Sequence, residues 1–192
     1  MNADRDFEAA AAAFAASVIG GALPPEVEAL IARAGNLRGQ PEEALALLMR
    51  ARALAPKHPV PIIAVYRFHF YGHALAQARS AGEDALAVAR TALGPDFGDV
   101  PPSDEAVRGD AAVRFYLFTL KGLAYLNLRL NELEEARLML GELRRLDPKD
   151  HLGGGLLSHV LARHDAGDAA APVDGPAGYP ARGWAEPKKQ GN

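Results

Sequence analysis

Between residues 120 and 148, apolar positions recur at helical spacing in two runs with a short polar turn between them. Each run places its leucines and alanines on one face, as amphipathic helices do. Ala124 and Ala136 are small residues at corresponding places in the two runs, which allows the two helices to approach closely. The pattern predicts a helical hairpin that cannot bury its apolar face alone, and therefore stacked neighbouring hairpins.

Two further hairpins are expected upstream, over about residues 26–56 and 62–93. In the first, Pro41 stands where a second helix begins, a position at which the missing N–H of proline costs nothing. In the other, Ser80 and Glu83 have the spacing of a capping box and predict the start of a second helix there.

The clearest hairpin covers about residues 113–148, where Asn131 with Glu134 predicts the start of the second helix. The stretch 94–110 contains three prolines and reads as a long loop or insertion. A last helix is expected within residues 151–163 as a C-terminal cap. Three successive glycines weaken its beginning, so that it begins nearer the leucines that follow them.

An alanine-rich N-terminal helix is predicted over residues 6–19. Phe7, Phe14 and Val18 are spaced seven and four positions apart and share one face of it. The favoured interpretation is a capping helix that covers the first hairpin. The alternative is a detachable amphipathic segment for a partner.

The chain therefore divides into an N-terminal helix (1–22), a helical repeat domain (23–165) and a tail (166–192). The tail is rich in proline and glycine, lacks Leu, Ile and Phe, and is expected to be disordered. Trp184, the one tryptophan, falls in this tail. It is either incidental or the anchor of a short binding motif. A further hypothesis is that this motif folds back into the concave groove of the domain and inhibits it.

The small residues that seat each second helix, Ala44, Ala85 and Ala136, resemble the pattern of the tetratricopeptide-repeat (TPR) family over about residues 26–163. The chain departs from that pattern at Gly35, where the family usually has an aromatic residue. The resemblance implies an all-α fold, a TPR-like solenoid of about three helical hairpins with N- and C-terminal capping helices.

In that family the first helix of each hairpin lines a concave surface that binds a segment of another protein. Carried over to this chain, the resemblance implies a lining rich in cations and aromatic rings. Its candidate partner-binding residues are Arg33, Asn36, Arg67, Phe70, Gln77, Phe118, Lys121, Tyr125 and Arg129. Such a surface suits an acidic or carboxylate-ended peptide. The alternative is that Phe70, Phe118 and Tyr125 are core residues.

A second resemblance comes from an aromatic and basic helix motif that occurs twice, at residues 66–71 and 114–121. In this feature the chain resembles small helical-repeat proteins encoded beside nitrogen-fixation genes. That resemblance implies an assembly or accessory factor for a metalloenzyme rather than a catalyst.

Composition excludes several classes of function. The net charge is −3, so no global basic field favours nucleic acid. The absence of cysteine removes disulfides, thiolate catalysis and thiolate metal sites. An acidic N-terminus without a long apolar run does not read as a signal peptide or membrane span. We expect a cytoplasmic protein with no cofactor, no membrane contact and no nucleic-acid partner.

Catalytic and metal sites are weakly supported. His69 and His73 are four positions apart and would share one face of a helix, yet no third ligand has a matching spacing. No phosphate-binding loop or nucleophile elbow is present, so we expect no enzyme activity. The favoured function is a protein-binding scaffold or adaptor. A metal-handling accessory protein using the two histidines and a self-associating module that buries its concave surface in a dimer are the alternatives.

Overall fold

The computed structural model describes residues 3–20, 22–37 and 39–167. Within those ranges the chain forms α-helices and one π-helical segment and has no β-strand, so the all-α prediction is confirmed. The elements are α1 (Ala3–Phe14), η1 (Ala15–Ile19), α2 (Pro25–Asn36), α3 (Pro41–Leu54), α4 (Pro59–Tyr71), α5 (Leu75–Leu93), α6 (Asp104–Gly109), α7 (Ala111–Arg129), α8 (Leu133–Leu146) and α9 (Gly155–Asp165).

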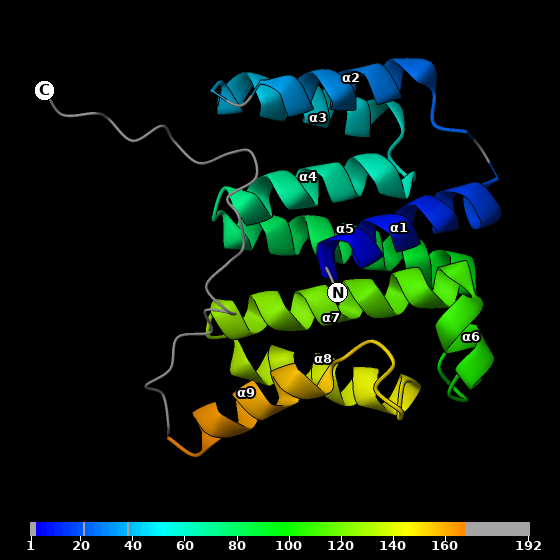
Figure 1. Ribbon diagram of the computed structural model, residues 1–192, viewed down its shortest axis with the longest axis vertical. Coiled ribbons are helices and arrows are strands. Elements are labelled where there is room, and N and C mark those ends of the chain that lie inside the picture. The colour runs from blue at the N-terminus through cyan, green and yellow to red at the C-terminus, as the bar shows by residue number, and fades with distance from the viewer. Residues whose placement is uncertain (1–2, 21, 38, 168–192) are drawn as a thin grey trace, which may run out of the picture.

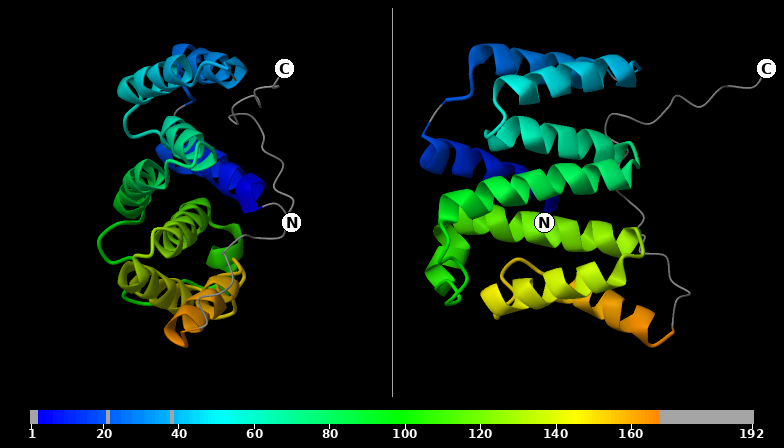
Figure 2. Two further views of the ribbon diagram at one scale, coloured as in Figure 1. Left: turned by 90° about the vertical axis from the view of Figure 1, so that its left-hand side faces the viewer. Right: turned by 180° about the vertical axis from the view of Figure 1, so that it is seen from behind.

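Helices α2 to α8, apart from the short α6, pack in chain order as three pairs: α2 with α3, α4 with α5, and α7 with α8 (Figure 1). The first helices of the pairs form one layer and the second helices form the other (Figure 2). Ala44, Ala85 and Ala136 are fully buried in the second-helix layer. Small side chains at these positions let neighbouring helices approach, which is the role that their spacing predicted.

Two helix starts differ from the prediction. Helix α4 ends at Tyr71, and α5 already begins at Leu75, so Ser80 lies inside α5 and does not cap it. The turn between them depends on His73, whose φ of 58° lies in the left-handed region. Asn131 also adopts a left-handed conformation and lies in the turn before α8, which has no side-chain cap.

The stretch expected to be a long loop contains a short helix, α6, whose N-cap is Ser103. The remainder of that stretch is fixed against the body of the molecule. Arg145 donates a hydrogen bond of 2.6 Å to the carbonyl oxygen of Gly98, and the ring of Phe97 packs edge-on against Tyr116 at 5.1 Å. The insertion is therefore an ordered part of the fold.

The N-terminal helix lies in a different place from the one expected. Instead of covering the first hairpin, α1 packs on α4 and α7, on the outer side of the first-helix layer (Figures 1 and 2). The physical reason is the stacking of aromatic rings. Phe7 and Phe14 are both buried, and both stack on Phe115 of α7. The first hairpin, residues 26–56, has no aromatic residue that could take the place of Phe115.

The C-terminal helix α9 packs on α8 and begins at Gly155, close to the start expected from the glycine run. A Cβ on the preceding Gly154 would lie 2.6 Å from the Leu143 side chain, so any larger residue in this turn would force Leu143 of α8 to shift. The predicted tail, including Trp184, lies almost entirely outside the described residues. Among the described helices, none has the length and hydropathy needed to cross a membrane.

Candidate functional site

Most of the predicted binding residues meet on one surface, which we call the α4–α7 face. It is the side of α4 and α7 on which α1 lies (Figure 1). The face consists of aromatic and cationic side chains. From α4 and α7 these are Tyr66, Arg67, Phe70, Tyr71, Phe115, Phe118, Lys121, Tyr125 and Arg129.

One part of this face, the covered end, lies under α1. Phe7 packs edge-on against Tyr66 at 5.6 Å between ring centroids and stacks on Phe115 at 6.0 Å. Phe14 also stacks on the Phe115 ring, at 4.8 Å between ring centroids. Glu8 forms an ion pair of 2.8 Å with Arg67. The helix α1 therefore supplies both apolar and acidic groups to this end.

The other part, the open end, is built from the last turns of α4 and α7. Phe70 lies 5.9 Å from Tyr125 and 5.5 Å from Tyr71, and all three rings are partly exposed. Arg129 donates a hydrogen bond of 2.8 Å to the Tyr125 hydroxyl and is exposed to solvent. Within the described part of the chain, Arg129 makes no ion pair. Phe70 and Tyr125 thus pack against other rings, as core residues do, and also keep part of their surface accessible, as binding residues do.

Rings connect the two ends without a break. Phe70 stacks on Tyr66 at 5.8 Å, with the planes 11° apart, and Tyr66 in turn contacts Phe7. The row runs from Phe14 through Phe115, Phe7 and Tyr66 to Phe70 and Tyr125. Such a row fixes the position of each ring and leaves the rings at one end able to contact another molecule.

Lys121 was expected to bind an acidic peptide, but a loop of the same chain already holds it. Its ammonium group is half-buried and donates to the carbonyl oxygen of Leu152 in the turn before α9. Burial lowers the pKa of Lys121, while the nearby carboxylates of Asp150 and Asp6 act in the opposite direction. Lys121 therefore ties α7 to the C-terminal turn and adds positive potential beside α1.

The remaining predicted residues are placed less centrally. Phe118 is half-buried with the Arg114 guanidinium 5.2 Å above its ring. Arg33 and Asn36 are exposed on α2, the first helix of the neighbouring hairpin. Gln77 does not belong to the first-helix layer at all, because α5 begins two residues before it. The placement of Gln77 on a first helix was wrong, because the α4–α5 turn occurs earlier than the pattern indicated.

The proposed histidine pair is not formed. His69 is on the last turn of α4, whereas His73 is beyond the helix in the left-handed turn. The two side chains therefore do not share a helix face. Among the described residues there is no group of three or more His, Asp or Glu side chains that could hold a metal ion. Burial lowers the pKa of His69, and its ring packs against Phe68 at 5.4 Å.

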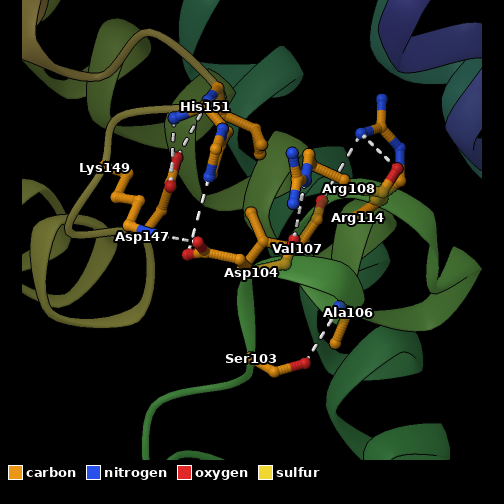
Figure 3. Close-up of polar contacts among 10 residues, drawn as sticks. Ser103, Asp104, Ala106, Val107, Arg108, Arg114, Asp147, Lys149 and His151 are labelled. Atoms are coloured by element: carbon orange, nitrogen blue, oxygen red, sulfur yellow. Dashed lines mark hydrogen bonds and ion pairs between the residues drawn. The ribbon is translucent and has the colours of Figure 1, made fainter.

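A second polar cluster, which the sequence did not indicate, joins α6 to the turn after α8 (Figure 3). Asp104 pairs with Lys149, and His151 Nε2 lies 3.7 Å from its second oxygen. The bond to Lys149 lowers the pKa of Asp104. The buried Asp147 accepts backbone N–H groups from His151 and Leu152 at 3.0 and 2.8 Å. These contacts satisfy one another and fix the turn, so the cluster is structural.

Sequence reasoning missed the role of α1 in the site. Phe7 and Glu8 were assigned to a cap on the first hairpin, and Tyr66 and Phe115 were not among the binding residues. A signal was present in the run Asp6, Phe7 and Glu8, an aromatic residue flanked by two acids. Such a run complements a surface of cations and aromatic rings.

Comparison with known proteins finds a relative of this chain. The chain is similar to a protein of Azotobacter chroococcum mcd 1 described as an uncharacterized 19.8 kDa protein in the nifW 5′ region. The two are 36% identical over 124 residues, which is 62% of this chain and 70% of the relative. The location of that relative agrees with the second resemblance, to proteins encoded beside nitrogen-fixation genes. No family model and no solved structure matches the chain.

Proposed function

This chain belongs to the same family as the 19.8 kDa protein of the nifW 5′ region of Azotobacter chroococcum, and from that premise we propose that it is a non-catalytic adaptor. In this proposal the helical hairpins form a TPR-like stack, and the α4–α7 face holds a segment of another protein. The nifW region of the relative favours a partner that takes part in nitrogen fixation, so that the adaptor serves as an accessory or assembly factor.

The observation that carries the proposal is the open end of the α4–α7 face. It combines partly exposed rings, Phe70, Tyr71 and Tyr125, with the exposed cation Arg129. Aromatic residues and arginine are the side chains most enriched at the centres of protein interfaces. Arginine also binds carboxylates through two parallel hydrogen bonds, so an acidic partner segment fits this surface best.

A metal-handling function has less support, because the histidine pair on which it depended does not share a helix face. An adaptor needs only a surface and a bound segment. Three-hairpin surfaces of this size are expected to bind such a segment with an affinity on the order of micromolar, since the segment loses conformational freedom when it binds.

Site-directed photo-crosslinking in the native host, grown under nitrogen-fixing conditions, tests the proposal. The photoreactive analogue of phenylalanine, p-benzoylphenylalanine, replaces Tyr125 in the full chain. The matched control places it at Leu138, an apolar residue on α8 that is 75% exposed and belongs to the other layer. We expect a discrete crosslinked protein from position 125 only, and Arg129→Glu should remove it. The same product from both positions, or none from 125, would exclude an adaptor that works through this face.

A further inference from the structure

The helix α1 differs from the other long helices in how it is held. Each helix from α2 to α5, together with α7, α8 and α9, packs on a helix next to it along the chain or across only a short insertion. In contrast, α1 packs on α4 and α7, both distant from it in sequence. It continues into the π-helical turn η1 and ends at Gly20, whose φ of 67° is left-handed. Isolated π-helical turns are rare and often mark functional segments.

Few large side chains attach α1 to the face. Phe7 and Phe14 are buried, while the other buried positions among residues 6–19 are the alanines Ala10, Ala11 and Ala15. Val18 and Ile19, the apolar residues at the end of η1, are more than a third exposed. The Glu8–Arg67 ion pair is also exposed, and exposed pairs contribute little. The stack formed by α2 to α9 is continuous without α1, so this helix can leave without interrupting the stack.

From this arrangement we infer that α1 is an internal ligand of the α4–α7 face, and that a partner protein replaces it with a helix of the same chemistry. The inference rests on the proposed function and specifies the class of partner. That partner carries an amphipathic helix in which an aromatic residue is flanked by acids, as Phe7 is by Asp6 and Glu8. A second aromatic residue follows seven positions later, with small residues between the two, as in α1.

Each part of that motif has a binding group on the face. The first aromatic ring fits between Tyr66 and Phe115, the second stacks on Phe115, and the following acid pairs with Arg67. The charge of Lys121 interacts with the acid that precedes the first aromatic residue, which is Asp6 in α1. Since the row of rings continues to Phe70 and Tyr125, a partner helix longer than α1 also contacts the open end. This additional contact lets a partner compete with a helix that is tethered to its own site.

A fluorescein-labelled synthetic peptide with the sequence of residues 3–19 serves as the probe. Its anisotropy is measured with the full-length protein, with the variant F7A/F14A and with the control V18A/I19A. The control truncates exposed apolar residues of the same segment. We expect the peptide to bind F7A/F14A at least tenfold more tightly than the other two proteins, because a loosened α1 leaves a larger fraction of the face free. Arg67→Glu in the F7A/F14A background should weaken peptide binding severalfold, and a peptide with Glu8→Arg should recover that loss.

A folded F7A/F14A variant that binds the peptide no more tightly than the wild type would overturn the inference. Light scattering that shows a dimer of F7A/F14A in place of peptide binding would also overturn it, since the occupant would then be a second copy of this chain.

Hydrogen exchange on the unmodified protein tests the same inference without any substitution. We expect the amides of α1 to exchange at least a hundredfold faster than those of α7, since α1 opens by itself. Equal protection of the two helices would show that α1 leaves only when the whole molecule unfolds, and the inference would fail. Failure here leaves the crosslink at position 125 intact, whereas loss of that crosslink rejects the adaptor function.

Discussion

The two ends of the α4–α7 face have nearly the same composition but different surroundings. At the covered end, Phe115 is fully buried beneath the rings of Phe7 and Phe14. At the open end, Phe70 and Tyr125 keep part of their surface in solvent, beside the exposed Arg129. The difference shows that the chain's own acidic and aromatic helix covers one half of this surface, while the other half stays in contact with solvent.

The largest effect should follow from Phe115→Ala at the covered end. This change removes a fully buried ring on which two others stack, and such losses cost about 3–5 kcal/mol of the free energy of unfolding. At the open end, Tyr125→Ala should cost about 1 kcal/mol, since that ring is only half-buried. Urea unfolding of the two variants measures both values. Equal losses would mean that the two ends do not differ in structural role.

Overpacking in the second-helix layer should lower the stability of the protein but should not affect one end of the α4–α7 face more than the other. Ala136 is fully buried on α8, which packs against α7 from the other layer. Ala136→Leu should therefore cost about 1–3 kcal/mol through displaced neighbours. Thermal melts give the loss, and the Tyr125 crosslink should persist in the variant wherever it stays folded. A melt identical to that of the wild type would show that the assigned packing of this hairpin is wrong.

The ion pair between Glu8 and Arg67 should contribute much less. A double-mutant cycle of Glu8→Gln and Arg67→Gln should give a coupling energy of about 0.2–1 kcal/mol, because Glu8 is exposed and Arg67 is partly exposed. The coupling should decrease in high salt, which screens exposed charges. A coupling that does not change with salt would indicate that α1 shields the pair from solvent.

The smallest effect concerns the pH dependence of stability near the open end. Burial lowers the pKa of His69 in the folded protein below its ordinary value of 6.5, so the unfolded chain takes up the proton first as the pH falls. Stability should therefore decrease from about pH 6.5 downward, through the folded-state pKa. Denaturation of the wild type and of His69→Gln at pH 7.5 and 5.5 measures this. The variant should lose less stability on acidification, and a larger loss in the variant would contradict the sign.

Much of the fold could be predicted because local signals mark it. Pro25, Pro41 and Pro59 each stand at the first position of a helix, and Ala44 and Ala136 mark close helix contacts. The α4–α5 turn could not be located, because it depends on a left-handed conformation of His73 that local preference does not favour. Nor does the proline-rich insertion reveal that Arg145 will hold it in place.

The site was predicted in part for a similar reason. Residues on one helix face, such as Phe118, Lys121 and Tyr125, follow from periodicity. The helical spacing of Phe7 and Phe14, however, is satisfied by any apolar surface of the right width, so periodicity alone could not choose between the first hairpin and α7. The engagement of Lys121 depends on tertiary contact with a loop some thirty residues away, which no local pattern contains.

The long-range contact of α1 has a consequence for biosynthesis. The ribosome makes Phe14 about a hundred residues before Phe115, the ring that buries it. At a synthesis rate of about 5–20 residues per second, Phe7 and Phe14 remain without their partner Phe115 for on the order of 5–20 s. During that interval the nascent chain presents two unburied aromatic residues on an alanine-rich helix, which is a substrate that a chaperone at the exit tunnel can recognise.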